Sequence, residues 1–278
     1  MKLARFAFAL MSSSAALAAA SAAHAQGGAP PLRDTVTLGL GIGVSSDYDG
    51  ADEYRLIPGG VVQGTVKGHD FRLNGLQLFV DAVPNDPART VQLELGPVVG
   101  LRFNRSGGIK DAQVAALGKL DEAVELGLRG GIGIAGVGNR SGTLSLGATA
   151  VHDVAGAHDS WRISPSVDYS TLVGRRTFVR ASVGVDFASN AYADYYFSVS
   201  PAGAVASGLA PFAARGGLES VGANVLATHS LSGGRQGWSI FAIGSVSRLQ
   251  GDFADSPIVR DAGDATQFFG SAGIAYTF

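Results

Sequence analysis

The sequence predicts an all-β protein, a single antiparallel transmembrane β-barrel of about twelve strands with short periplasmic turns and longer outer loops. Three observations predict this fold. Apolar and polar residues alternate along many segments, the chain begins with an export signal, and it ends on an aromatic residue inside a strand-like pattern. Because both chain ends are expected on the periplasmic side, the number of strands is even, and ten is the alternative.

The first 25 residues have the layout of a secretory signal peptide. Lys2 and Arg5 precede an apolar stretch that ends in an Ala-His-Ala cleavage site, so residues 26–278 are the predicted barrel. Residues 1–25 hold two basic and no acidic residues, which leaves 19 basic and 23 acidic residues and a formal net charge of −4. This balance argues against nucleic acid as a partner. The absence of cysteine excludes disulfides and Cys-based metal sites.

Alternation with a period of two predicts strands rather than helices. In residues 90–104, TVQLELGPVVGLRFN, six of the large apolar side chains fall on one face, and Glu94 and Arg102 fall on the other. The same pattern recurs in four further segments, at 36–45, 124–134, 161–170 and 180–187. Beyond residue 25 no run of 18 apolar residues occurs, so no transmembrane helix is expected.

The composition of the two strand faces favours a barrel in lipid. The polar faces are poor in lysine and rich in Gly, Ser and Thr, and the chain contains 40 glycines in 278 residues. Small inward residues suit a narrow lumen, and a continuous apolar face suits contact with lipid. A soluble β-sandwich has the same period and is the alternative fold.

Turn-forming segments separate eleven clear strands. Short separators lie at 66–70, 84–88, 136–142, 154–160, 173–176 and 232–237, and longer ones lie at 45–54, 105–122, 189–216 and 251–265. Since the number must be even, either residues 193–200, ADYYFSVS, form a twelfth strand, or one of the eleven segments is two strands.

Eight charged residues fall on the predicted polar faces and so point into the lumen. They are Glu94, Arg102, Glu125, Arg129, Arg162, Asp168, Arg180 and Asp186. Their signs balance, which predicts cross-strand ion pairs that fill a narrow lumen. The same charges could line a small aqueous pore and tune its selectivity.

Two other clusters have weaker signals. The segment SDYDGADE contains four acidic residues but lacks the spacing of a calcium-binding EF-hand, so it predicts a solvated outer loop, with divalent-cation bridges to lipopolysaccharide as a further hypothesis. A turn near residue 155 brings together five residues of the types that hydrolases use in catalysis: His152, Asp153, His158, Asp159 and Ser160. Serine with histidine at a membrane edge is one arrangement for a lipid-modifying enzyme, but these are also ordinary turn residues.

Several stretches carry a family pattern. They are YDGADEYRLIPGGVV early in the chain, NAYADYYFSVSP and ASGLAPFAARGGLES in the middle, SRLQGDFADSPIVRD, and the closing FFGSAGIAYTF. In these stretches, over nearly the whole mature chain, the sequence resembles the MltA-interacting protein family (MipA/OmpV) of Gram-negative outer-membrane barrels. RLQGDFADSPIV and the terminal YTF are the most specific parts. The chain departs from the family in LIPGGVV, where a second proline is usual, and in an alanine-rich segment at 105–122.

The resemblance implies a non-enzymatic scaffold in the outer membrane, with no cofactor and no family catalytic residues. Members of the family are described as joining a periplasmic lytic transglycosylase to a penicillin-binding protein in cell-wall turnover, and others as porin-like. The closing residues Ile274, Tyr276 and Phe278 resemble the signal that the barrel-assembly machinery recognises. We therefore expect contacts with outer-membrane lipid and lipopolysaccharide. A narrow channel for small solutes is the second hypothesis, and a lipid-modifying enzyme is the third.

Overall fold

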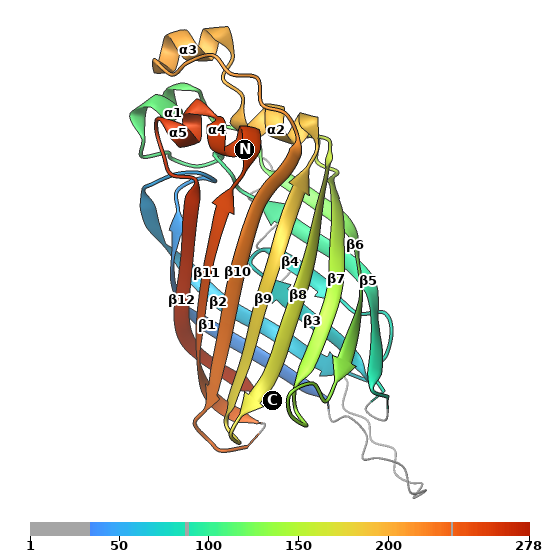
Figure 1. Ribbon diagram of the computed structural model, residues 1–278. Helices are drawn as coiled ribbons and strands as arrows, with labels where there is room; N and C mark the ends of the chain where they lie inside the picture. The colour runs from blue at the N-terminus through green and yellow to red at the C-terminus, as the bar shows by residue number, and fades with distance from the viewer. Residues whose placement is uncertain (1–33, 87–88, 235) are drawn as a thin grey trace, which may run out of the picture. The chain divides into compact units, whose positions relative to one another are not determined.

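The structure is a computed structural model that describes residues 34–86, 89–234 and 236–278. The predicted signal peptide lies outside the described residues. Twelve antiparallel strands form one closed barrel (Figure 1), which confirms the predicted fold class and strand number. Each strand pairs with its neighbours in the chain, and the first strand pairs with the last. No helix among the described residues is long and apolar enough to cross a membrane.

The strands differ in length mainly at one place in the wall. The first six are β1 (Thr35–Ser46), β2 (Tyr54–Val66), β3 (His69–Asn74), β4 (Gln77–Val80), β5 (Val91–Arg102) and β6 (Ala123–Ala135). The last six are β7 (Thr143–Asp153), β8 (Trp161–Val173), β9 (Thr177–Ala188), β10 (Gly217–Ser230), β11 (Gly237–Leu249) and β12 (Thr266–Thr277). Only β3 and β4 are shorter than eleven residues.

The twelfth strand comes from a hairpin whose two-residue turn is not among the predicted separators. The predicted segment between the separators at 66–70 and 84–88 contains both β3 and β4, which are joined at Gly75, where φ is +58°. Residues 193–200 do not form a strand. They overlap α2 (Asn190–Phe197), because the Ser189 side chain caps the helix by accepting a hydrogen bond from the Tyr192 backbone N–H.

The outer face of the barrel is apolar and the inner face is polar. Leu40 and Leu56 are 80% and 75% exposed, as expected for side chains that contact lipid. In β5 the apolar residues predicted to face outward, Val91, Leu93 and Leu95, are exposed, while Glu94 between them is partly buried. Lipid supplies the apolar environment that these outer side chains lack in the isolated chain.

The long loops lie at one end of the barrel and most of the short turns lie at the other (Figure 1). The long loops carry the five helices of the described residues: α2, α1 (Ala112–Ala116), α3 (Pro201–Ser207), α4 (Gly251–Asp255) and α5 (Pro257–Arg260). The connection at 154–160, which the sequence groups with the short turns, lies at the helical end because it joins β7 to β8. The helical end is the outer one, and the turn end is periplasmic.

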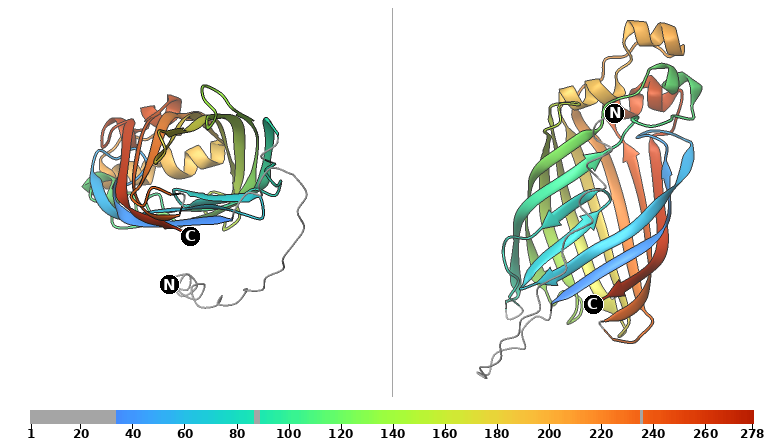
Figure 2. Two further views of the ribbon diagram at one scale, coloured as in Figure 1. Left: turned by 90° about the horizontal axis from the view of Figure 1, so that it is seen from below. Right: turned by 180° about the vertical axis from the view of Figure 1, so that it is seen from behind.

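The helices and loops of the outer end form a packed cap. Its apolar core includes Tyr192, Tyr196, Phe197 and Phe253, each at most 1% exposed. Viewed along the barrel, α2 lies within the ring of strands (Figure 2). The cap therefore covers the outer opening.

Barrel closure depends on close contact between β1 and β12, where glycine faces glycine. Gly41 is paired with Gly273, and a Cβ added to either would lie 2.2 Å from a carbonyl oxygen of the facing strand, Ala272 for Gly41 and Leu40 for Gly273. A methyl group cannot fit at this distance without moving the backbone.

We expect Gly41→Ala to destabilise the folded barrel by about 2 kcal/mol, because the added methyl forces the two strands of the closing pair apart. The measurement is urea unfolding in detergent micelles, together with the heat-dependent gel shift of the folded form. Gly244→Ala in β11 is the matched control, because a Cβ there meets nothing within 4 Å. Equal unfolding transitions for the two variants would contradict the proposed contact.

Candidate functional site

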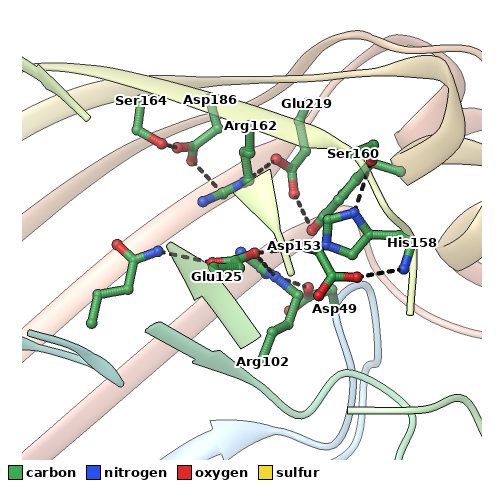
Figure 3. A network of polar contacts seen from close by, with 12 residues as sticks. Asp49, Arg102, Glu125, Asp153, His158, Ser160, Arg162, Ser164, Asp186 and Glu219 are labelled. Carbon is green, nitrogen blue, oxygen red and sulfur yellow. Dashed lines mark hydrogen bonds and ion pairs between the residues drawn. The ribbon is translucent and has the colours of Figure 1, made fainter. Parts of the chain in front are cut away.

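The outer half of the lumen contains a network of ion pairs directly below the cap (Figure 3). Arg102 at the end of β5 donates from Nε to Glu125 Oε1 on β6 at 2.8 Å, and its Nη1 lies 3.6 Å from Asp49 Oδ2 in the loop after β1. Gln77 on β4 donates from Nε2 to the second oxygen of Glu125 at 3.1 Å. Glu125 is 1% exposed, so the two charges are held away from bulk water.

A second arginine extends the network across β8, β9 and β10. Arg162 donates from Nε to Glu219 at 2.5 Å, and its Nη2 lies 3.1 Å from Asp186 Oδ2 in an ion pair. Ser164 and Ser220 donate their hydroxyls to the two oxygens of Asp186. The buried carboxylates of this group are thus each satisfied by an arginine or by hydroxyl donors, as burial of charge requires.

A β-bulge brings Glu219 into this network. Between β9 and β10 the register pairs Leu218 with Phe187 and Ser220 with Asp186, so Glu219 is the extra residue. Both Glu219 and Ser220 are buried, while Leu218 is exposed on the outer face. In a regular strand, consecutive side chains point to opposite faces. The bulge allows the Glu219 carboxylate to point inward although the next residue, Ser220, also points inward.

The network also holds the cap. The Tyr192 hydroxyl of α2 donates to Glu219 Oε1 at 3.1 Å, and the Arg102 guanidinium lies 5.3 Å from the centre of the Tyr192 ring. Tyr192 is fully buried and belongs to the core of the cap. One side chain therefore connects the cap to both arginines, since Arg162 binds the same glutamate.

A separate network occupies the periplasmic half of the lumen. Arg129 on β6 lies between two carboxylates, with Nε 3.3 Å from Glu94 and Nη2 3.5 Å from Asp168. Arg72 on β3 donates to the same oxygen of Glu94 at 3.0 Å. Asp168 also accepts from Ser182 at 2.5 Å. These contacts link β3, β5, β6, β8 and β9 across the interior.

The structure places seven of the eight predicted luminal charges in direct ion pairs. The seven are Glu94, Arg102, Glu125, Arg129, Arg162, Asp168 and Asp186. Arg180 has no hydrogen bond or ion pair within the described part of the chain and lies over the Phe178 ring, 5.8 Å from its centre. The sequence analysis missed Arg72, which alternates correctly with Phe71 and Leu73 but lies in the unseparated hairpin, and Glu219, which the bulge repositions.

The His158 and Ser160 side chains form a buried pair in the turn after β7. His158 Nδ1 is 2.8 Å from Ser160 Oγ, and its Nε2 is 3.9 Å from Glu125 Oε1. Both residues are 5% exposed, and the imidazole packs against three tyrosines of α2, namely Tyr192, Tyr195 and Tyr196. Burial lowers the pKa of His158, although the Asp153 and Glu125 carboxylates act in the opposite direction. This pair contributes to the packing of the cap.

The remaining members of that cluster support the turn as well. Asp153 accepts backbone N–H bonds from Ala155, His158 and Asp159, and His152 Nδ1 lies 2.7 Å from the Asp153 carbonyl oxygen. Ser160 also borders an outer hollow of about 510 Å³, but the histidine that it contacts is buried behind it. Among these five residues the geometry gives no exposed pair of nucleophile and base.

The acidic segment after β1 is tied to the barrel by arginines. Asp47 lies 3.5 Å from Arg55, and Asp49 contacts Arg102. Within the ranges that the structure describes, no group of three or more His, Asp or Glu side chains is arranged to hold a metal ion.

The closing residues of β12 lie on the outer surface at the periplasmic end. Ile274 and Phe278 are 55% and 58% exposed, and Tyr276 packs its ring against Phe278 and against Trp238 of β11. Aromatic residues at this level are typical of the interfacial girdle of outer-membrane barrels.

Comparison with known proteins identifies the family. Residues 38–278 match the family model described as MltA-interacting protein MipA. The chain belongs to the MipA family. No curated protein matches it.

Solved structures with a similar arrangement are outer-membrane barrels. A channel from Pseudomonas putida F1 is 13% identical with a TM-score of 0.46, and the match covers 90% of this chain and 97% of that one. The NanC porin is 7% identical with a TM-score of 0.40, with 88% and 99% covered. The DcaP channel of Acinetobacter baumannii is 10% identical with a TM-score of 0.33, with 88% and 96% covered. These likenesses carry no functional argument.

We expect Glu125→Ala to lower the free energy of unfolding by about 3 kcal/mol, because it leaves the Arg102 guanidinium buried without its nearest carboxylate. Urea unfolding in micelles measures the change. Asp261→Ala removes the carboxylate of an exposed pair with Arg260 and is expected to leave the transition unchanged. Similar behaviour of the two variants would show that the buried network does not stabilise the fold.

The lowered pKa of His158 makes the stability of the cap depend on pH. An unfolded histidine binds a proton near about pH 6.5, whereas the folded one binds it at lower pH, so the unfolded state holds more protons between these two values. We therefore expect the free energy of unfolding to fall between about pH 7.5 and 5.5. This fall should be smaller for His158→Gln. The exposed His229→Gln should retain the wild-type dependence, and a wild-type dependence in both variants would contradict the assignment.

Proposed function

We propose that this barrel is a closed outer-membrane anchor whose periplasmic turns bind a lytic transglycosylase of the MltA type. The barrel would keep this murein-cleaving enzyme, together with the matching penicillin-binding protein, at the membrane. The observation that carries the proposal is the interlocked interior. The cap is bonded through Tyr192 to a charge network that joins strands on several sides of the lumen. A lumen filled in this way favours a role for the surfaces over transport through the centre.

The two ends of the barrel carry opposite charge. Among the described residues, the exposed basic side chains of the turn end are Lys67, Arg89, Arg140, Arg175 and Arg176. The exposed acidic side chains there are Asp34 and Asp86, and Asp86 lies 3.3 Å from Arg89. This basic rim, defined by the five residues, would attract an acidic face of a periplasmic enzyme or the carboxylates of murein. Complementary charge accelerates association and orients the partner.

At the outer end, exposed acidic side chains outnumber basic ones in the described loops. The acidic ones are Asp52, Asp121, Glu122, Asp159, Asp194, Asp255, Asp261 and Asp264, and the basic ones are Lys110, Lys119, Arg215 and Arg260. This charge suits contact with lipopolysaccharide through bridging divalent cations, which bind carboxylate and phosphate oxygens together. The outer end would then hold the barrel among its lipids while the rim binds its partner.

The test is binding of the refolded barrel to the purified lytic transglycosylase MltA of the same organism, measured by biolayer interferometry. We expect the double variant Arg175→Glu and Arg176→Glu to weaken binding about tenfold or more, and high salt to weaken the wild type. Lys119→Glu with Arg215→Glu makes the same change in net charge at the outer end and should bind normally. Absence of wild-type binding, or equal effects of both double variants, would contradict the proposal.

A further inference from the structure

A cavity of about 190 Å³ lies at the periplasmic end of the lumen, below the Arg129 network. It is lined from β1, β2, β3 and β9, and its polar lining consists of Thr35, Thr37, Gln63, Thr65, Asp70, Arg72 and Arg180. Thr35 begins β1, Thr65 is next to the end of β2, and Arg180 is the fourth residue of β9. Because these positions adjoin the turn end of their strands, the cavity is at the periplasmic mouth of the barrel.

Arg180 is an inward cation that forms no ion pair in either of the two luminal networks. Arg72 beside it donates to Glu94, and Asp168 is satisfied by Arg129, Ser166 and Ser182. The Arg180 guanidinium forms no hydrogen bond or ion pair within the described residues and lies over the Phe178 ring. A guanidinium has five N–H donors in a planar fork that matches a carboxylate. An inward arginine that is half-buried and lacks such a partner indicates a position for a ligand oxyanion.

The same cavity contains a carboxylate that has no cationic partner. Asp70 accepts one hydrogen bond at each oxygen, from Thr65 Oγ1 at 2.5 Å and from Asn85 Nδ2 at 2.7 Å, and no basic side chain of the described chain forms an ion pair with it. An ionised carboxylate can accept about four hydrogen bonds, so each oxygen of Asp70 keeps the capacity for one more. A simple anion in the cavity would be repelled by this charge.

We propose that the cavity binds a small zwitterion of the amino-acid type, with its carboxylate on Arg180 and its ammonium group on Asp70. The opposite charges of the cavity match those of such a solute, whereas a monoanion or a monocation would meet one attractive and one repulsive group. The Gln63 and Thr35 side chains have no hydrogen bond within the described residues and are free to contact the bound molecule. Phe178, on the same face as Arg180, provides an apolar wall for its side chain. This inference is independent of the scaffold role.

The test is isothermal titration of the refolded full-length barrel in micelles with three probes. L-leucine is the zwitterion, isovalerate retains only the carboxylate, and isoamylamine retains only the amine. We expect L-leucine to bind at least about tenfold more tightly than either analogue, since it alone satisfies both charges. Arg180→Gln should weaken L-leucine binding about tenfold or more, and Asp70→Asn should do the same. Arg215→Gln, in an exposed loop at the outer end, should bind as the wild type does.

Each result of this titration either supports or overturns the proposed binding site. Failure of the wild type to bind L-leucine, or binding that survives Arg180→Gln in a folded sample, would overturn the site. Equal affinity for isovalerate and L-leucine, with no effect of Asp70→Asn, would overturn the zwitterion and leave a carboxylate site. The heat-dependent gel shift of each variant confirms that it is folded. Arg180→Gln is expected to fold, because the Arg180 side chain forms no hydrogen bond or ion pair within the described residues.

Discussion

The contact between Arg162 and Glu219 connects parts of the molecule that otherwise have few contacts in common. Glu219 also accepts the hydroxyl of Tyr192, so the same carboxylate joins the barrel wall to the helix that lies across its outer opening. Charges in this position are shielded from bulk water and must be paired with one another, because an isolated buried charge is costly. The arrangement of the outer lumen follows from that requirement, with Arg102 and Glu125 forming the neighbouring pair under the same tyrosine ring.

The two charge networks have different consequences. The outer one is complete, since its arginines and carboxylates are each satisfied, and it stabilises a cap that packs as a small apolar core of its own. The periplasmic one leaves Arg180 and Asp70 without ionic partners beside an open cavity. The charges of the outer lumen are thus paired, whereas two charges at the periplasmic end lack an ion-pair partner within the described residues. The exposed basic side chains of the turns lie at this same end. The basic rim and the cavity therefore share the periplasmic end of the barrel.

The sequence predicted much of this barrel because period-two alternation is a local property that each strand carries by itself. It predicted the fold and the number of strands. Seven of the eight charges that it assigns to the polar faces lie in ion pairs. It did not separate β3 from β4, because the turn between FRLN and QLFV consists of only two residues, Gly75 and Leu76, and is too short to stand out as a separator. It also did not place Glu219 in the lumen, because a bulge depends on how a strand pairs with its neighbour and not on the strand's own pattern of residues. Residues 193–200 are compatible with a strand by sequence because their aromatic residues suit either state, and packing under the cap favours the helix in the part that overlaps α2.

The central claim is that the paired charges and the cap close the lumen. Single-channel recording of the refolded, heat-modifiable protein in a planar bilayer tests it most directly, with Arg129→Ala, which removes the central cation of the periplasmic network, as the comparison. We predict that the wild-type protein gives no discrete conductance steps. Steps whose size or ion preference changes in Arg129→Ala would contradict the account and would establish an open channel lined by these charges.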